Sequence, residues 1–233
     1  MGNLLTVTDL RFSYRNKYQT VHALKEATCT FERGKAYAIM GKSGSGKTTL
    51  LSLIAGLETP DGGQILFDGE DTAKMDRDAF RRNNAAVIYQ NYNLFPLLTV
   101  KENVLYSMKL KGIPNREAEA RAEKELTAVG IAKDQWKRFP PQLSGGEQQR
   151  VAIARALAAG NELILADEPT GNLDEENSAL VVDMLIRLAH EEGRCVIIIT
   201  HDAELAVRMD RTYVMRDGVL VGAKNPDCGN SST

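Results

Sequence analysis

The chain has 233 residues, 43% of them hydrophobic and 26% charged, and its 29 lysines and arginines nearly balance its 31 aspartates and glutamates. The formal net charge of −2 gives no overall attraction to nucleic acid, so we expect no nucleic-acid partner. No run approaches the roughly 20 apolar residues that a membrane-spanning helix needs, and residues 1–10 lack the layout of a secretion signal. We therefore expect a cytoplasmic globular protein with one large domain or a domain carrying an insertion.

The cysteines exclude two further classes. Cys29, Cys195 and Cys228 are odd in number, widely spaced and in no C-x-x-C arrangement. This pattern predicts neither a disulfide framework nor a zinc site.

The first strands are expected in residues 4–34, where apolar and polar residues alternate. The alternation predicts two or three antiparallel strands. Tyr14 lies between them in an aromatic stretch, and two interpretations stay open at this point. Its ring could stack on a nucleotide base, or it could be an ordinary half-buried strand tyrosine.

Residues 41–48 read Gly-Lys-Ser-Gly-Ser-Gly-Lys-Thr and match the phosphate-loop pattern G-x-x-x-x-G-K-[ST] at every fixed position. An apolar run at 36–40 predicts a buried strand before the loop, and 49–57 predicts a helix after it. Successive N–H groups are expected to wrap a phosphate chain, because the three glycines can take backbone angles barred to other residues. Lys47 would then contact the β and γ phosphates, and the Thr48 hydroxyl would bind magnesium. The three glycines are Gly41, Gly44 and Gly46.

A strand predicted at 64–69 follows the helix, and another at 85–89 ends at Gln90. An amide at the end of a buried strand, beside a phosphate loop on the same sheet, is well placed to contact magnesium or the attacking water. A solvated strand end is the alternative.

Residues 91–160 have a different character, since helical patterns replace strand patterns. Helices are predicted at 99–111 and at 115–129, the second capped by Asn115. The segment is interpreted as an inserted helical subdomain. The apolar residues at its entry, Phe95, Leu97 and Leu98, indicate either a partner-docking surface or a loop buried against the subdomain's own helices.

Ser144, Gly145 and Gly146 precede a helix predicted at 148–159 and repeat the logic of the phosphate loop. They offer free N–H groups, a small hydroxyl and the positive end of a helix dipole. One nucleotide cannot need both devices from one face of a small fold, unless the second reaches across from another copy. An ordinary capped helix is the alternative.

Two more strands are predicted to end in polar groups. An apolar strand at 163–166 leads into Asp167 and Glu168, and alternation predicts that these carboxylates point to opposite sides. Asp167 suits magnesium and Glu168 suits polarising a water. A strand at 194–200 ends at His201, which falls where the γ phosphate would lie. Asp174 precedes a helix predicted from about 175 to 191, and Asp202 could be simply the cap of a helix at 203–209. A hairpin is predicted at 213–221, and 225–233 is expected to be a frayed tail.

The ordered set G-K-S-G-S-G-K-T, Gln90, L-S-G-G-E, L-I-L-A-D-E-P-T-G-N-L-D and His201 resembles the nucleotide-binding subunit of an ABC transporter. The resemblance covers almost the whole chain. The stretches N-L-F-P-L-L-T-V-K-E-N-V and A-D-E-P-T-G-N-L-D further resemble the branch of macrolide, lipoprotein-release and antimicrobial-peptide exporters.

The resemblance implies an α/β fold: a P-loop NTPase (RecA-like) core with an N-terminal antiparallel β subdomain and an inserted α-helical subdomain. Residues 1–233 would be one nucleotide-binding domain, with 1–90 and 161–233 as catalytic core and β subdomain and 91–160 as the helical subdomain carrying the signature.

It also implies roles for single residues. Glu168 would be the catalytic base, His201 the γ-phosphate switch and Gln90 the sensor that links nucleotide to membrane partner. Magnesium would be bound by Thr48, Gln90 and Asp167, and Asp174 would lie at the dimer seam. ATP would be contacted by Tyr14, by Gly41, Lys42, Ser43, Gly44, Ser45, Gly46, Lys47, Thr48 and Thr49, and from the opposite subunit by Ser144, Gly145 and Gly146.

Two positions depart from the family's pattern. Lys42 stands where proline is common, and Glu147 replaces the commoner glutamine. Neither change removes a phosphate ligand, so activity is expected to survive.

The resemblance implies an ATPase that uses ATP and Mg²⁺, pairs head to tail with a second copy, and drives an integral membrane permease docked near residues 90–98, at the cytoplasmic face of the membrane. Two other functions remain to be separated from transport. One is a soluble ABC-type ATPase in DNA repair or translation, which the near-neutral charge and the single nucleotide domain disfavour. The other is an unrelated phosphate-loop kinase, which should lack L-S-G-G-E.

Overall fold

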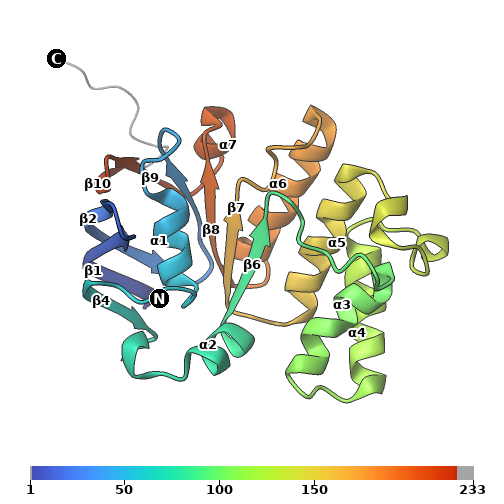
Figure 1. The fold of residues 1–233 in the computed structure, drawn as a ribbon. Coiled ribbons are helices and arrows are strands. Elements are labelled where there is room, and N and C mark those ends of the chain that lie inside the picture. The colour runs from blue at the N-terminus through green and yellow to red at the C-terminus, as the bar shows by residue number, and fades with distance from the viewer. Residues whose placement is uncertain (1, 225–233) are drawn as a thin grey trace.

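A ten-stranded sheet runs through the structure, a computed structural model that describes residues 2–224 (Figure 1). The strand order is β5-β4-β1-β2-β10-β9-β3-β8-β7-β6. The strands are β1 (Asn3–Arg15), β2 (Thr20–Glu32), β3 (Ala36–Met40), β4 (Gly62–Phe67), β5 (Glu70–Asp71), β6 (Ala85–Tyr89), β7 (Leu163–Asp167), β8 (Cys195–Thr200), β9 (Arg211–Arg216) and β10 (Val219–Lys224).

The helices are α1 (Lys47–Ile54), α2 (Arg77–Asn83), α3 (Val100–Leu110), α4 (Asn115–Ala128), α5 (Gly145–Ala158), α6 (Glu175–His190) and α7 (Ala203–Val207). Three short 3-10 turns lie at Thr72–Lys74, Lys133–Gln135 and Pro140–Gln142.

Five neighbouring strands, β9, β3, β8, β7 and β6, are parallel. Their registers are in step: Met40 pairs with Thr200, and Asp167 pairs with both Ile199 and Tyr89. Parallel strands in one register end at one edge of the sheet. The residues that follow β3, β6, β7 and β8 therefore meet at that edge.

The antiparallel part is built from two long strands, β1 and β2, each of 13 residues, with β4 paired to β1 and β5 paired to β4. The prediction of an antiparallel N-terminal region is confirmed. Bulges between Val7 and Leu10 and between Leu10 and Phe12 keep β1 continuous through its irregular alternation. β2 joins the parallel part through Glu26, which pairs with Val219 of β10.

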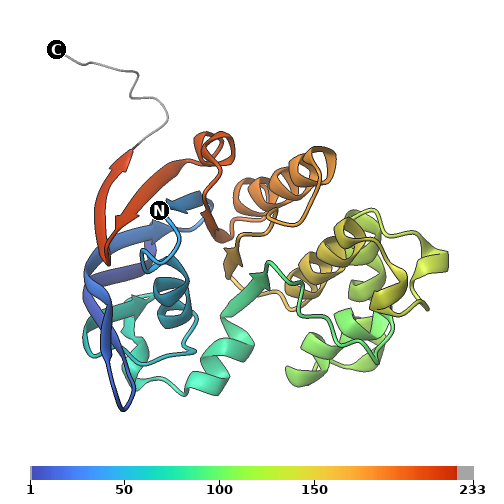
Figure 2. The same cartoon turned by 45° about the horizontal axis from the view of Figure 1, so that its top comes forward.

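Each face of the sheet carries its own hydrophobic core. Alternate residues of β8 serve the two cores, since Ile197 and Ile199 belong to one and Val196 and Ile198 to the other. The first core includes α1 and Phe80 of α2, and the second includes buried residues of α3 to α7. Figure 2 shows α3, α4 and α5 gathered beyond β6, away from α1. The grouping of residues 91–160 as a separate subdomain stays a prediction.

Several helix ends differ from the sequence prediction, and α5, for example, begins at Gly145 rather than at 148. Asn115 does not cap α4, because the helix begins at Asn115 itself after Pro114, which offers no side-chain acceptor. α1 ends at Ile54 rather than near Leu57, since Gly56 takes a left-handed φ of 70° and Leu57 N–H turns back to Ser52 O.

The cysteines and the termini add little to the fold. Cys29 and Cys195 are buried, and neither forms a disulfide within residues 2–224, while Cys228 and the predicted tail at 225–233 lie outside the described residues. Within residues 2–224, no helix is long and apolar enough to cross a membrane, and no three His, Cys, Asp or Glu side chains cluster as a metal site.

Candidate functional site

The phosphate-loop residues 41–48 leave the end of β3 and enter α1, so the predicted strand, loop and helix are all present. Lys47 is buried, and its Nζ donates to Gly41 O at 2.8 Å and to Lys42 O at 3.0 Å. The loop thus folds around its own ammonium group. A cation at this place attracts the oxygens of a phosphate chain.

The glycines of the loop serve two different purposes. Gly44 and Gly46 have φ values of 76° and 106°, which favour glycine, as predicted. Gly41 is not among the residues with positive φ, so the predicted reason is wrong for it. It is needed for close packing, because a Cβ there would lie 2.4 Å from Met215 O and 2.7 Å from Ser45 Oγ.

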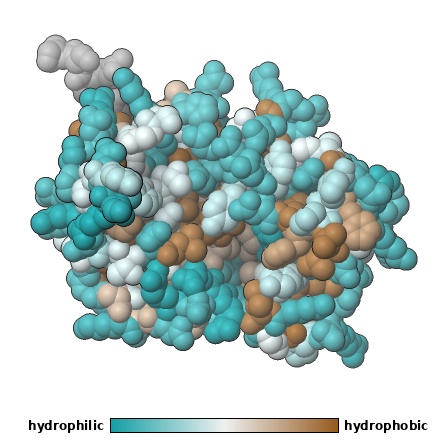
Figure 3. Space-filling model, in the orientation of Figure 1, coloured by the Kyte–Doolittle hydropathy of each residue, from teal (hydrophilic) through white to brown (hydrophobic). Residues whose placement is uncertain are grey.

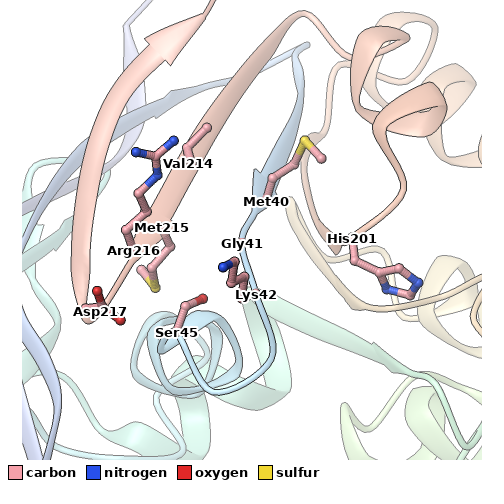
Figure 4. Close-up of a pocket in the computed structure, with 9 residues that line it drawn as sticks. All are labelled: Met40, Gly41, Lys42, Ser45, His201, Val214, Met215, Arg216 and Asp217. Carbon is pink, nitrogen blue, oxygen red and sulfur yellow. The ribbon is translucent and has the colours of Figure 1, made fainter.

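A cavity of about 690 Å³ lies beside this loop (Figure 4). Figure 4 shows Met40, Gly41, Lys42 and Ser45 on one side, the β9 end and turn from Val214 to Asp217 on the other, and His201 apart from both. Ser45 Oγ is buried and has no hydrogen-bond partner among residues 2–224. Neither Thr48 nor Asp167 is among the residues that line this cavity, so the cavity flanks the loop and does not cover them.

Thr48 Oγ1 and Asp167 Oδ1 are 3.4 Å apart, so the loop and the end of β7 meet. Burial raises the pKa of the Asp167 carboxyl, and the nearby charge of Glu168 adds to the rise, while the Thr48 hydrogen bond and Lys47 oppose it. A hydroxyl and a half-buried carboxylate are hard oxygen ligands of the kind that Mg²⁺ prefers. Such a site is completed by phosphate oxygens and waters rather than by a full set of protein ligands.

Glu168 follows β7 with a left-handed φ of 46°, an unusual backbone for a residue other than glycine. The prediction that strand alternation separates it from Asp167 is wrong, because β7 ends at Asp167. The turn itself re-aims the side chain. Glu168 Oε2 lies 3.1 Å from His201 Nδ1, which follows β8. A second cavity, of about 270 Å³, is lined by both residues.

Gln90 follows β6 and is tied to the segment after β7. Its Nε2 approaches Asn172 Oδ1 at 3.5 Å, and Asn172 Nδ2 donates to Gln90 O at 3.2 Å. A Cβ at Gly171 would lie 2.7 Å from Gln90 Nε2. Gln90 is therefore packed against the loop that carries Glu168 and is no freely solvated strand end.

Tyr14 comes from β1 and reaches the start of α1, where its hydroxyl lies 3.3 Å from Thr49 Oγ1. The ring packs edge-on against Phe12 at 4.9 Å between centroids, and the residue is 47% exposed. Ser43, in the phosphate loop that leads into α1, is also exposed. An exposed ring tethered to the loop is available for stacking, and its role stays a prediction.

Ser144 caps α5 and lies apart from residues 41–48. Among the described residues, no hydrogen bond or ion pair joins Ser144, Gly145 or Gly146 to the phosphate loop. A Cβ at Gly145 would lie 2.8 Å from Tyr92 Oη, and one at Gly146 would lie 2.6 Å from Asn177 Oδ1. A side chain at either glycine would meet Tyr92 or Asn177 of the same chain, and that neighbouring side chain would have to shift.

The sequence analysis missed four residues that hold the site together. Asn172 holds Gln90, and Asn177 packs on Gly146 while its Nδ2 donates to both Asp174 oxygens, at 2.9 and 3.0 Å. Tyr92 contacts Gly145, and Arg155 donates to the carbonyls of Tyr92 and Asn93. Asn177 stands three residues after Asp174, the cap of α6, and this spacing could have indicated the contact between them. Asn172 lies in the quoted stretch A-D-E-P-T-G-N-L-D without a role of its own, and no pattern pointed to Tyr92 or Arg155.

An apolar surface lies over α3 and the segment before it. Phe95 is 41% exposed and Leu97 is 87% exposed, so the alternative of a loop buried by its own helices is wrong. The rings of Phe95 and Tyr106 are 4.7 Å apart. Figure 3 shows apolar residues gathered at lower right, over the α3 to α5 part.

Comparison with known families decides what kind of site this is. The family model described as ABC transporter matches residues 24–171. The chain belongs to the ABC transporter family. It is the ATP-binding cassette, the ATPase domain of such a transporter, and this excludes the alternative of an unrelated kinase.

Relatives of the ABC transporter family match over nearly the whole chain. YclH of Bacillus subtilis, an ABC transporter ATP-binding protein, is 39% identical over 94% of this chain and 99% of its own length. The macrolide export ATP-binding/permease protein MacB of Aggregatibacter actinomycetemcomitans is 40% identical over 94% of this chain. The chain spans only 34% of that MacB.

Solved ABC structures confirm the predicted P-loop NTPase fold. The cassette MJ0796, in a dimeric post-hydrolysis state bound to ADP and Pi, matches with a TM-score of 0.88 and 33% identity over 95% of this chain and 98% of that chain. CbiO1 from Clostridium perfringens matches with a TM-score of 0.86 and 29% identity over 97% of this chain and 90% of that one.

Proposed function

We propose that the chain is the motor subunit of an exporter-type or mechanotransmission-type ABC transporter, working as an ATP-dependent head-to-tail pair on a separate membrane permease. The observation that carries the proposal is the split between two phosphate-binding devices. Gly41, Gln90, Glu168 and His201 follow neighbouring parallel strands, whereas Ser144 to Gly146 lie at the start of α5, beyond β6.

The separation of the phosphate loop from Ser144 to Gly146 within one chain supports a dimer as the functional unit. Gly145 and Gly146 lie beside Tyr92 and Asn177 of the same chain at the start of α5, apart from the phosphate loop. A second copy related by a two-fold axis would bring its own Ser144 to the ATP held by this loop. The dimeric structures of MJ0796 are consistent with this arrangement.

The proposed chemistry is hydrolysis of the γ phosphate. The Glu168 carboxylate accepts a proton from a water while the water oxygen bonds to the γ phosphorus. The bond from that phosphorus to the bridging oxygen breaks, and ADP and phosphate are the products. His201 holds Glu168 in place through the 3.1 Å contact, and Lys47 offsets the charge of the β and γ phosphates.

The family resemblance also assigns contacts with adenine, the phosphates and magnesium, and we propose these contacts for the residues that follow. Tyr14 stacks on the adenine, and N–H groups of residues 41–49 surround the phosphates. Thr48 would hold magnesium, with Asp167 and Gln90 supporting it from the β7 and β6 ends, since their oxygens suit this ion. When bound, the ion would neutralise phosphate charge during the transfer.

The proposed output is mechanical. The exposed Phe95 and Leu97 follow Gln90 closely in the chain, so a cytoplasmic loop of the permease docked on residues 90–98 would lie next to the nucleotide site. Loss of the γ phosphate would open the pair and move this surface. The chain would thereby lie at the cytoplasmic face of the membrane. The macrolide-export name of the MacB relatives favours a drug as cargo, and the branch resemblance in the sequence adds peptide or lipoprotein.

The Glu168→Gln variant tests the proposal. Glutamine keeps the shape and the contact to His201 but cannot act as a base, so hydrolysis should stop while ATP binding persists. The variant should elute from gel filtration as a dimer with ATP and as a monomer with ADP. A matched control is Glu192→Gln, an exposed carboxylate beyond α6. Wild-type turnover by Glu168→Gln, or a monomer at saturating ATP, would contradict the proposal.

A further inference from the structure

The hydroxyl of Ser144 is already occupied within its own chain. Ser144 Oγ donates to Glu147 Oε2 at 2.9 Å, and Ser144 N–H donates to the same oxygen at 2.7 Å. In return, Glu147 N–H donates to Ser144 Oγ at 3.3 Å. A serine hydroxyl has one proton to donate. That proton cannot serve Glu147 and a phosphate oxygen at the same time.

The carboxylate of Glu147 is firmly held. Its second oxygen, Oε1, accepts a hydrogen bond from Gln135 Nε2 in the 3-10 turn at Lys133–Gln135. The hydrogen bonds from Ser144 and Gln135 lower the pKa of Glu147, and Arg150 adds to the effect, so the group is negatively charged at neutral pH. A fixed negative charge therefore lies in contact with the exposed Ser144.

We infer that Glu147 is a positioning residue that weakens the ATP-bound pair by competing with phosphate for the Ser144 hydroxyl. The inference rests on the proposed function, because Ser144 must meet the ATP of a second copy. On pairing, the hydroxyl turns from Glu147 to a phosphate oxygen, and two anions are brought close to one serine. Their repulsion raises the ATP concentration that pairing needs and speeds reopening after hydrolysis.

The chain contains a matched case in which the same arrangement lacks this consequence. Thr99 and Glu102 form the same capping box at the start of α3, with Thr99 Oγ1 donating to Glu102 Oε2 at 2.7 Å. Both boxes stabilise a helix start. Only the box at Ser144 belongs to the signature that is proposed to meet phosphate.

The test titrates the Glu168→Gln variant with Mg-ATP and measures the fraction of dimer by sedimentation. Adding Glu147→Gln keeps a side chain that can accept the Ser144 N–H bond but removes the charge. We expect the ATP concentration at half-maximal dimer to fall several-fold. Adding Glu102→Gln should leave it unchanged. The effect of Glu147→Gln should also shrink as salt rises, because salt screens exposed charges.

A structural role alone would give a different result. If Glu147 serves only the helix start, Glu147→Gln and Glu102→Gln will behave alike, with an unchanged or raised midpoint and no dependence on salt, and the inference is overturned. Glu147→Ala is the second variant: it loses the cap and some thermal stability, and should still dimerise at lower ATP. If Glu168→Gln alone stays monomeric with ATP, the proposed pairing itself is wrong, and this inference falls with it.

Discussion

His201 Nδ1 and Glu168 Oε2 are 3.1 Å apart, although the residues are separated by 33 positions in the chain. The contact exists because β7 and β8 are neighbouring parallel strands and because Glu168 leaves β7 with a left-handed φ of 46°. A glutamate in that backbone costs about 1 kcal/mol or more, so the surrounding structure has to hold it. The Glu168 N–H bond to Ile199 O at 3.0 Å is part of that support.

Removing the histidine should therefore misplace the glutamate. We expect His201→Ala to lower kcat for ATP hydrolysis by about 100-fold, in the range of a lost acid–base arrangement, while ATP affinity changes little. Phosphate release and nucleotide binding are the measurements. His190→Ala is the control, because His190 Nε2 bonds to Asp210 on another part of the structure. Equal turnover in the two variants would contradict the role of the Glu168 contact.

Asp167→Asn should stabilise the nucleotide-free chain at neutral pH. Burial raises the pKa of Asp167, so the folded chain binds the proton at this carboxyl more tightly than the unfolded chain does. This contribution is fully present below the ordinary aspartate pKa of about 4 and is lost as pH rises through the raised value. The variant should melt a few degrees above wild type at pH 7. The gain should vanish toward pH 4, whereas the exposed Glu70→Gln should show no such trend.

Arg155→Lys should loosen the segment after Gln90. Tyr92 and Asn93 both have left-handed backbones, with φ of 62° and 47°. Arg155 Nη1 donates to Asn93 O at 2.7 Å, and Nη2 donates to Tyr92 O at 3.1 Å. A lysine cannot make both bonds in this geometry, so we expect a loss of about 1–3 kcal/mol in the free energy of unfolding. Limited proteolysis within residues 91–98 should quicken. Arg116→Lys, at an exposed position of α4, is the control, and equal proteolysis of both would refute the clamp.

The loop glycines should respond unequally to alanine. A Cβ on Gly44 has open space, so Gly44→Ala should cost only the left-handed strain of about 1–2 kcal/mol. A Cβ on Gly46 would lie 2.5 Å from Ala23 O, a backbone atom, so Gly46→Ala should cost clearly more. Urea denaturation measures both. Similar losses would mean that the contact with Ala23 relaxes easily.

The sequence predicted the parts of the site that come with a local pattern. The phosphate loop, the strand ends at Gln90, Asp167 and His201, and the capped start of α5 were all found, because each combines a periodic apolar run with a polar terminus. These patterns fix which residues end a strand, and parallel pairing then brings the ends together.

What the sequence did not predict depends on tertiary contacts. The left-handed backbone of Glu168, the contact of Tyr92 with Gly145 and the packing of Asn177 on Gly146 join residues with no shared pattern. Gly41 is a further example. A Cβ there would clash with Met215 O, and the sequence does not show that these two distant positions lie close together. The roles of these residues toward a nucleotide stay predictions until the variants above are measured.

The ammonium of Lys47 gives the loop a property of its own. With Gly41 O and Lys42 O as acceptors, the charge is coordinated by oxygen before any ligand arrives. When a phosphate chain binds, its oxygens would replace Gly41 O and Lys42 O around the Lys47 ammonium. Little further ordering of the loop would then be needed. Because two carbonyls of the loop already hold the ammonium, association with ATP should be limited by diffusion and charge rather than by a search through loop conformations.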